Sequence, residues 1–516
     1  MGAMSLNLAL ILRESAKKNP DHLAVIFESF KFTYGQLDAL SNQVASNLKA
    51  AGLQRGDRVG LMLPNVPQFP MAYFGILKAG GIVVPMNVLL KAPEVGFYMG
   101  DSESRFLIVW DDFAGEALKG IANLKPITTY VALKPGGSDP PAGTKSFMDL
   151  IAGNPKFDME PTAADDTATI LYTSGTTGRP KGAELTHSNL FLNCHLNSLV
   201  FNSTPDDVTL CVLPMFHSFG QSSVMNVAIH VGGTLTLVPR FDTEKVLEVI
   251  QRDKVTVFPG VPTMFFALLH HPNSDKYDTS SLRICVSGGA SLPGEVMQAF
   301  EKKFGPTILE GYGLSETSPT ATFNVSAERR KVLSIGTPMF GVELKVFDEN
   351  DNALPPGKDN VGEIVIRGHN VMKGYWKNPE ATAEAFKGRW FHTGDLGYVD
   401  EQGYYFIVDR KKEMIIRGGF NVYPREVEEV LYAHPAVGEA AVIGIPDERL
   451  GEEVKAVVSL KPGATATEVD IIAFVKERVA AYKYPRTIQF VDTLPKGATG
   501  KILKKELKAQ LEAAKA

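Results

Sequence analysis

The sequence predicts an α/β protein: a large N-terminal domain of parallel sheets flanked by helices plus a small β unit, and a small, mobile α+β C-terminal domain. Up to about residue 290, apolar runs typical of buried strands alternate with helical segments of about 10–15 residues, as in parallel β-α-β units. From about residue 337, polar and apolar residues alternate as in antiparallel strands. Because 516 residues are too many for one core, we expect several folding units.

The N-terminal domain begins with a recognisable helix start. Thr33 and Gln36 fit a capping box, and apolar residues then recur at helical spacing from Leu37 to Leu48. A strand at 58–63, a helix through 73–77 and a strand at 81–85 follow. We expect the same pattern in strands at 168–171, 208–213, 234–238, 255–259 and 282–287, and in a helix over 243–252.

The second half of the chain has a different pattern. Alternating segments separated by Asn, Asp, Pro and Gly predict a small antiparallel β unit over about 337–408. The charged run 409–413 is either a solvated turn or a hinge between domains. Beyond it we expect a compact α+β unit with a helix starting at Pro424, strands at 440–445 and 453–460, and a helix over 469–480. We place the N-terminal domain at 5–409, the hinge at 410–413 and the C-terminal domain at 414–516.

Residues 172–182 form the most informative segment, with five hydroxyl-bearing side chains, three glycines and two cations. Glycines let the backbone approach a bulky anion, and successive N–H groups and hydroxyls can ring its oxygens. Lys181 supplies a point positive charge. The segment follows a strand and precedes an apolar-periodic helix near Asn189, which favours a phosphate-binding loop over a solvated linker.

This loop differs from the common nucleotide-binding motifs. A P-loop places Gly directly before its Lys, whereas Pro180 precedes Lys181 here. The dinucleotide fingerprint also fails, because Glu316 stands where its last Gly would be. The chain therefore handles a phosphate-bearing nucleotide through another fold.

The loop resembles the phosphate-binding signature of the adenylate-forming superfamily, which includes AMP-forming acyl-CoA synthetases, adenylation domains and beetle luciferases. Further motifs match in family order at 213–217, 310–317, 392–397, 408–412 with 418–420, and 494–496 with 500–501. The resemblance extends from about Phe32 to Leu507. It implies ATP and Mg²⁺, coenzyme A as a co-substrate, and an acyl-adenylate intermediate.

The resemblance also assigns roles to single residues. Glu316, with Ser174 as a weaker contact, would hold Mg²⁺, a hard cation that prefers oxygen ligands. The bland alternatives are a helix-capping Glu316, a Tyr312 packed in the core, and C-terminal lysines that only add solubility. The implied catalytic residues are Lys501, Lys181, His217, Ser315 and Glu316. The implied nucleotide-binding residues are Thr173, Ser174, Gly175, Thr176, Thr177 and Lys181 for the departing phosphates, Ser315 for the α-phosphate, Gly289, Ala290, Glu310, Gly311 and Tyr312 for adenine, Asp395 and Arg410 for ribose, and Lys501 for the reacting oxygens.

The acid is expected to lack an α-amino group. Amino-acid-adenylating domains place a carboxylate after the Phe of the 213–217 motif, whereas this chain has His217 there and no carboxylate until Asp242. An unpaired ammonium in that pocket would be costly. The residues downstream of this motif are small or apolar, which suits an acyl or aryl tail. We expect the tail to contact His217, Phe219, Ser223, Val261 and Gly288.

The residues that would contact coenzyme A and the hinge residue are also assigned by resemblance. Gly418 and Gly419 match the stretch that lets the pantetheine arm pass, Lys412 matches the hinge residue, and Arg240 either meets the CoA phosphates or is a plain surface charge. Ile416 stands where plant aryl-CoA ligases carry lysine, which favours a medium- to long-chain fatty acid. Alternatives are an aryl (benzoate-type) CoA ligase, an acyl-AMP ligase that loads a carrier protein, and a non-catalytic nucleotide-binding protein.

Composition limits the remaining options. A net charge of −5 gives no sign of nucleic-acid binding. The three cysteines show no metal-binding spacing and are expected to be buried free thiols. Without a signal peptide or an apolar run of about 18 residues, we expect a cytoplasmic protein, a monomer or homodimer, with peripheral membrane contact left open.

Overall fold

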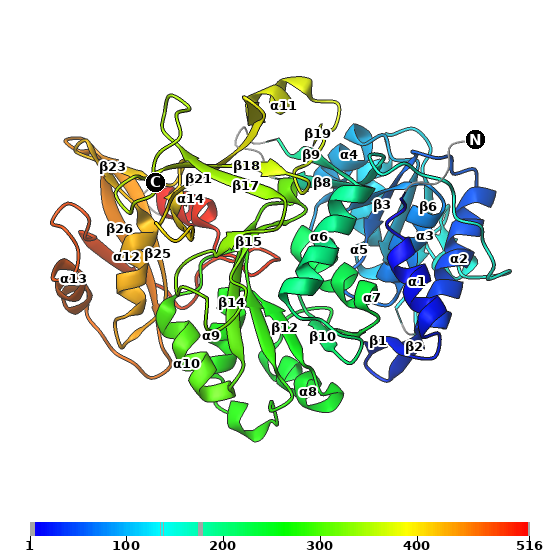
Figure 1. Ribbon diagram of the computed structural model, residues 1–516, viewed down its shortest axis with the longest axis horizontal. Helices are drawn as coiled ribbons and strands as arrows, with labels where there is room; N and C mark the ends of the chain where they lie inside the picture. The colour runs from blue at the N-terminus through cyan, green and yellow to red at the C-terminus, as the bar shows by residue number, and fades with distance from the viewer. Residues whose placement is uncertain (1–5, 135, 138, 174–178, 514–516) are drawn as a thin grey trace.

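The computed structural model describes residues 6–134, 136–137, 139–173 and 179–513. Its layers follow the order of the chain: an N-terminal α/β region in blue and cyan, a central α/β region in green, and a C-terminal unit in orange and red (Figure 1). The expected α/β class, with a large N-terminal domain and a small C-terminal one, is confirmed.

The first sheet runs in the order β19-β9-β8-β4-β3-β5-β6-β7, and its central strands pair in parallel. All four residues of β4 are buried, as expected where helices cover both faces of a sheet. The strands are β3 (Arg58–Met62), β4 (Ile82–Pro85), β5 (Phe106–Trp110), β6 (Thr128–Ala132), β7 (Lys145–Ser146), β8 (Thr167–Thr173), β9 (Lys181–Thr186) and β19 (Gly374–Tyr375), and the helices beside them are α2 (Tyr34–Ala50), α3 (Gln68–Lys78), α4 (Ala92–Asp101) and α5 (Asp111–Ile121).

The second sheet runs in the order β16-β15-β14-β13-β12-β10-β11-β1-β2 and is parallel from β14 to β1. Its strands are β1 (Leu23–Phe27), β2 (Phe30–Thr33), β10 (Val208–Cys211), β11 (Thr234–Leu237), β12 (Val257–Gly260), β13 (Ile284–Ser287), β14 (Thr307–Gly313), β15 (Thr320–Phe323) and β16 (Thr337–Pro338). The helices of this region are α1 (Leu10–Lys18), α6 (His187–Val200), α7 (Val227–Val231), α8 (Thr243–Asp253), α9 (Pro262–His270) and α10 (Gly294–Phe304), with a π-helix over Phe219–Asn226.

Two smaller sheets complete the molecule. In the small β unit, β17 (Val342–Phe347), β18 (Gly362–Gly368), β20 (Phe386–Lys387), β21 (Trp390–Val399) and β22 (Tyr405–Arg410) pair antiparallel beside α11 (Pro379–Ala385). The C-terminal unit contains β23 (Ile415–Arg417), β24 (Phe420–Val422), β25 (Val437–Asp447), β26 (Gly451–Leu460), β27 (Thr487–Phe490), α12 (Pro424–Tyr432), α13 (Glu468–Lys476) and α14 (Lys504–Ala513). Its own core lies between this sheet, α12 and α13.

Several local expectations hold and two do not. The capping box before α2 is present, with Thr33 Oγ1 accepting from Gln36 N. We did not expect β9, which pairs antiparallel with β8, because its sequence is too polar to be predicted as a strand from periodicity. The helix expected over 469–480 ends at Lys476, because the chain must turn back to bring β27 parallel to β26. Cys194, Cys211 and Cys285 are buried free thiols, as expected.

No helix among the described residues is both long and apolar enough to cross a bilayer.

The crossing of α2 and α3 gives a test of packing. A Cβ at Gly75 would lie 2.5 Å from Val44 Cβ and 3.0 Å from the Ser41 carbonyl oxygen. Although alanine favours a helix by about 1 kcal/mol over glycine, we expect Gly75→Ala to destabilise the protein by about 1–3 kcal/mol through overpacking. The measurement is the midpoint of thermal unfolding, which should fall.

Gly115 in α5 is the matched control, because a Cβ there would meet no atom within 4 Å. Gly115→Ala should raise the midpoint or leave it unchanged. If Gly75→Ala raises the midpoint as well, helix propensity rather than packing decides the effect.

Candidate active site

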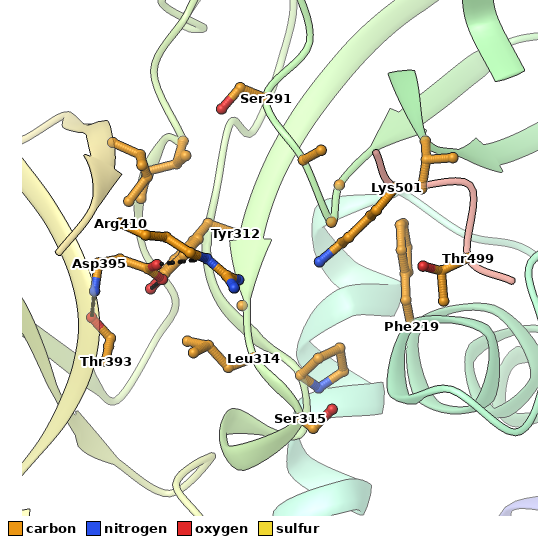
Figure 2. A pocket seen from close by; sticks show the side chains of 18 of the residues that line it. Phe219, Ser291, Tyr312, Leu314, Ser315, Thr393, Asp395, Arg410, Thr499 and Lys501 are labelled. Atoms are coloured by element: carbon orange, nitrogen blue, oxygen red, sulfur yellow. Dashed lines mark hydrogen bonds and ion pairs between the residues drawn. The ribbon is translucent and has the colours of Figure 1, made fainter. Parts of the chain in front are cut away.

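A cavity of about 1200 Å³ lies where the two large sheets, the small β unit and the C-terminal unit meet. Its walls come from the adjoining ends of β8 and β9, the π-helix, the ends of β13 and β14, and the loop that precedes α14. Lys501 points into it from one side, and Tyr312, Asp395 and Arg410 lie on the other (Figure 2).

The pairing of β8 with β9 places Thr173 beside Lys181. The last residue of β8 and the first of β9 are paired in register, so both side chains emerge where these two strands reach the cavity. The proposed phosphate contacts Ser174, Gly175, Thr176 and Thr177 lie outside the described residues.

Glu316 is buried at the same end of the cavity. Its Oε1 accepts hydrogen bonds from Thr173 Oγ1 at 3.0 Å and from Tyr375 Oη at 3.1 Å. Lys181 Nζ lies over the Tyr375 ring, 5.3 Å from its centroid, and 3.7 Å from Glu384 Oε2. Two donors on one oxygen fix the carboxylate and leave Oε2 without a hydrogen bond from those two residues.

Asp395 anchors the opposite end. Its Oδ2 accepts from Tyr312 Oη at 2.6 Å, its Oδ1 lies 3.3 Å from Arg410 Nε, and its backbone N–H donates to Thr393 Oγ1 (Figure 2). The β21–β22 ladder pairs Asp395 directly with Arg410. Burial raises the pKa of Asp395, and the Arg410 charge opposes that rise. The sequence separated these residues by fifteen positions, and the antiparallel turn brings them together.

Lys501 reaches the cavity from the C-terminal unit. The nearest atoms to its stem include Gly289, where a Cβ would lie 3.2 Å from Lys501 Cε. Burial, together with the Arg410 charge and opposed by Asp395, lowers the pKa of Lys501 to about 8. An ammonium in this position is well placed to meet anions, and it would be stabilised by them.

His217 also lines the cavity. Burial, followed by the Lys501 charge, lowers the pKa of His217 to about 4, so the imidazole is neutral near pH 7. The backbone N–H of Phe219 donates to His217 Nδ1 at 3.3 Å, which leaves the proton on Nε2.

Phe219 and Gly288, which were both expected to contact the acyl group, pack closely on one another. A Cβ at Gly288 would lie 3.1 Å from the Phe219 ring, so a larger residue would displace the ring. Ser223 and Val261, also expected to contact the acyl group, are buried and line the cavity. Ser223 Oγ accepts from Asn197 Nδ2 at 3.2 Å and lies 3.3 Å from Thr320 Oγ1.

The expected adenine residues lie together at the ends of β13 and β14. Gly289, Ala290, Glu310, Gly311 and Tyr312 all line the cavity. Burial raises the pKa of Glu310 to about 7, and among the described residues its Oε2 has no hydrogen-bond partner. Ser315 Oγ lies 3.4 Å from Ser218 Oγ, at the same wall as Glu316.

The residues expected to bind coenzyme A are not brought into the cavity. Arg240 is exposed after β11, and Gly418 and Gly419 form an exposed turn between β23 and β24. Lys412 is exposed at the cavity rim. The charged run around it is only partly solvated, because Asp409 is buried and accepts from the backbone N–H of Arg425 at 3.0 Å.

Sequence reasoning missed Tyr375 and Thr263. Tyr375 touches both Glu316 and Lys181, and Thr263 hydrogen-bonds to the loop that carries Lys501. The Gly374-Tyr375-Trp376 run could have indicated a short strand, but its pairing with β9 depends on contacts between distant segments. Nothing local distinguishes Thr263 from an ordinary residue near a helix start.

Comparison with known proteins places the chain in a family. Residues 12–376 match the AMP-binding enzyme family, and residues 426–501 match the AMP-binding enzyme C-terminal domain. A long-chain-fatty-acid–CoA ligase of Bacillus subtilis (strain 168) is 40% identical, covering 97% of this chain and 94% of that protein. A feruloyl-CoA synthase of Amycolatopsis sp. is 38% identical, covering 96% of each chain.

Solved structures agree. An anthranilate CoA ligase in complex with anthranoyl-AMP superimposes with a TM-score of 0.94 at 33% identity, covering 99% of this chain and 98% of that one. A benzoate CoA ligase of Burkholderia xenovorans LB400 gives a TM-score of 0.89 at 30% identity, covering 97% and 99%. The chain therefore belongs to the AMP-binding enzyme family and is an AMP-forming acyl-CoA ligase of the adenylate-forming superfamily.

Proposed function

We propose that this ligase activates a medium- to long-chain fatty acid. A carboxylate oxygen attacks the α-phosphorus of ATP, the bond to the β-phosphate oxygen breaks, and pyrophosphate leaves. The thiolate of coenzyme A then attacks the acyl carbon, and AMP leaves with the electron pair of the broken bond. The first step brings two anions together, so catalysis depends on positioning and charge neutralisation.

The position of Lys501 is the observation that carries this proposal. Its ammonium points into the cavity toward Asp395 and Arg410 (Figure 2), and His217 lines the same cavity, where the Lys501 charge lowers its pKa. Asp395 and Arg410 would hold the ribose, and Lys501 would bridge the carboxylate and nucleotide oxygens. A lysine in that place neutralises the negative charge that accumulates as the two anions meet.

The remaining nucleotide contacts follow from the cavity walls. Thr173 and Lys181 would hold the β- and γ-phosphates, Ser315 the α-phosphate, and the ends of β13 and β14 the adenine. Neutral His217 would donate from Nε2 to the carboxylate of the acid, because its Nδ1 already accepts from Phe219. That hydrogen bond would orient the nucleophilic oxygen without adding a second cation beside Lys501.

The phosphate end fits a magnesium ion. No group of three or more His, Cys, Asp or Glu side chains among the described residues could form a protein-only metal site. Glu316 has one oxygen fixed by Thr173 and Tyr375, which suits a single carboxylate ligand beside substrate phosphates. When bound, Mg²⁺ would neutralise phosphate charge. The chain's part is to orient Glu316.

The fatty-acid assignment rests on the apolar wall of Phe219, Val261 and Phe266, and on the Bacillus subtilis relative. A second candidate, an aryl acid, is favoured by a different observation. Ser287 lines the cavity, is fully buried, and its Oγ has no hydrogen-bond partner among the described residues. Ser223 and Thr320 also line the cavity, and with them the Ser287 hydroxyl could hydrogen-bond to a polar substituent on an aromatic ring. The relatives named feruloyl-CoA synthase and benzoate CoA ligase support this candidate.

A panel of acids tests the proposal directly. Short, medium and long saturated fatty acids, benzoate and ferulate compete for limiting enzyme with ATP and coenzyme A, and the acyl-CoA products are quantified by mass. We expect medium- or long-chain acyl-CoA to dominate. A predominance of benzoyl- or feruloyl-CoA would replace the fatty-acid assignment with the aryl one.

The role of Lys501 is tested by separating the two half-reactions. Because its charge matters when two anions meet, Lys501→Ala should slow acyl-AMP formation by about 10²–10³-fold, the scale for losing one preorganised donor. Conversion of supplied acyl-AMP with coenzyme A should persist. Pyrophosphate release without coenzyme A measures the first step, and acyl-CoA formation measures the second.

Two further variants act as controls for Lys501. Lys476→Ala removes an exposed lysine of the same domain and should change neither step. The wild-type kcat/KM for acyl-AMP formation should decline as the pH rises through about 8, where Lys501 of the free enzyme loses its proton. Lys501→Arg keeps its charge and should lack that decline. Equal loss of both half-reactions in Lys501→Ala would refute the assignment.

The hinge makes a separate prediction. Gly418 and Gly419 lie outside the cavity while Lys501 lies inside it, so the C-terminal domain must turn before both can serve one acyl carbon. Lys412→Pro fixes φ near −65°. We expect acyl-AMP formation to survive and thioester formation to fall by about tenfold or more. Loss of both with a lower unfolding midpoint would indicate misfolding, and no loss would place the hinge elsewhere.

A further inference from the structure

A direct hydrogen bond ties the loop of Lys501 to the N-terminal domain. Thr263 Oγ1, on α9, donates to the carbonyl oxygen of Gly500 at 2.9 Å. Gly500 has a φ of +78°, and a Cβ there would lie 2.9 Å from Val261 Cγ2 and 3.0 Å from Thr263 Oγ1. The two domains therefore meet in close contact at the residue before Lys501.

The loop is rigid on its own side of this contact. Gly497 N donates to the Lys501 carbonyl at 2.9 Å, and Leu503 N donates to the Pro495 carbonyl at 2.8 Å. Leu494 and Ile502 anchor the base of the loop in the apolar cluster under β25 and α14. A hydrogen bond that holds the Gly500 carbonyl therefore also restricts the position of the Lys501 Cα.

The Thr263 hydroxyl is directed out of its own helix. The N-cap residue of α9, Val261, has no side-chain cap, and Pro262 occupies the first turn. A threonine at this point could cap the helix by bonding its own backbone. Instead, the Thr263 hydroxyl donates its hydrogen bond to Gly500 in the other domain.

We propose that Thr263 is a positioning residue for Lys501: its bond to the Gly500 carbonyl holds the ammonium in place for acyl-AMP formation and is released when the C-terminal domain turns. This rests on the role proposed above for Lys501. A lysine side chain has four rotatable bonds, so its charge is precise only if its backbone is held. Arg425 and Glu429 of α12 also contact the N-terminal domain, at Leu333 and Gly294, but farther along the chain from Lys501.

The test compares Thr263→Val, which keeps the shape and removes the donor, with Thr263→Ser, which keeps the donor. One neutral hydrogen bond is worth roughly two- to tenfold in rate. Thr263→Val should therefore slow pyrophosphate release without coenzyme A by about that factor, while supplied acyl-AMP and coenzyme A react at the wild-type rate. Thr263→Ser should restore most of the first step.

A double-mutant cycle with Lys501→Ala shows whether Thr263 acts through Lys501. If it does, Thr263→Val should cost little in the Lys501→Ala background, because there is no ammonium left to position. The same loss in both backgrounds would mean that Thr263 acts on the substrate or on α9, and would overturn the proposal.

The other outcomes are equally decisive. No change in the first step of Thr263→Val, or equal loss of both steps with a lower unfolding midpoint, would also overturn it. If Lys501→Ala itself leaves acyl-AMP formation intact, the proposed role of Lys501 fails. A normal Lys501→Ala defect with an unaffected Thr263→Val refutes only the positioning role of Thr263.

Discussion

A single ammonium, delivered by one domain into a cavity walled by another, sets the conditions for the rest of the structure. Charge that leaves bulk water is stabilised only by nearby opposite charge. Burial and then the Arg410 charge lower the pKa of Lys501, Asp395 opposes them, and the net result is a pKa of about 8. An anionic nucleotide and an anionic acid would complete the neutralisation. In the proposed cycle, departure of pyrophosphate removes part of that anionic charge and weakens the hold on the Lys501 loop.

At another part of the cavity, the group that is held in place is an anion, the carboxylate of Glu316. Thr173 and Tyr375 both donate to one oxygen of Glu316, and burial beside that carboxylate raises the pKa of Tyr375, so its hydroxyl stays protonated. The same ring lies under Lys181. Tyr375 therefore couples the carboxylate and the lysine through β19, which pairs with β9 at the sheet edge.

The wall of the cavity around Phe219 is where the two proposed acids would differ. Phe219 packs on Gly288, so the position of its ring depends on the absence of a Cβ there. Deeper in, the hydroxyls of Ser223 and Thr320 both accept from Asn197 Nδ2. In the proposed function, a saturated chain would form no hydrogen bond with these hydroxyls, whereas a substituent on a ring could. This difference in hydrogen bonding distinguishes the two acids that are proposed as substrates, a fatty acid and an aryl acid.

The sequence by itself determined the class of fold, the helix start at Thr33 and the order of the motifs, because capping, glycine placement and apolar periodicity are local properties. It also named Asp395, Arg410 and Lys501, since each stands in a short motif. Only the tertiary structure decided that these three share one cavity while the turn at Gly418 and Gly419 lies outside it.

Tyr375 and Thr263 mark the limit of sequence reasoning. Each acts through a contact with a segment far away in the chain: Tyr375 through the pairing of β19 with β9, and Thr263 through the docking of the C-terminal domain. Neither residue sits in a pattern that differs from ordinary strand or helix sequence. Local sequence specifies local conformation, but which side chains meet across two domains follows from how the sheets pack and where the smaller domain docks.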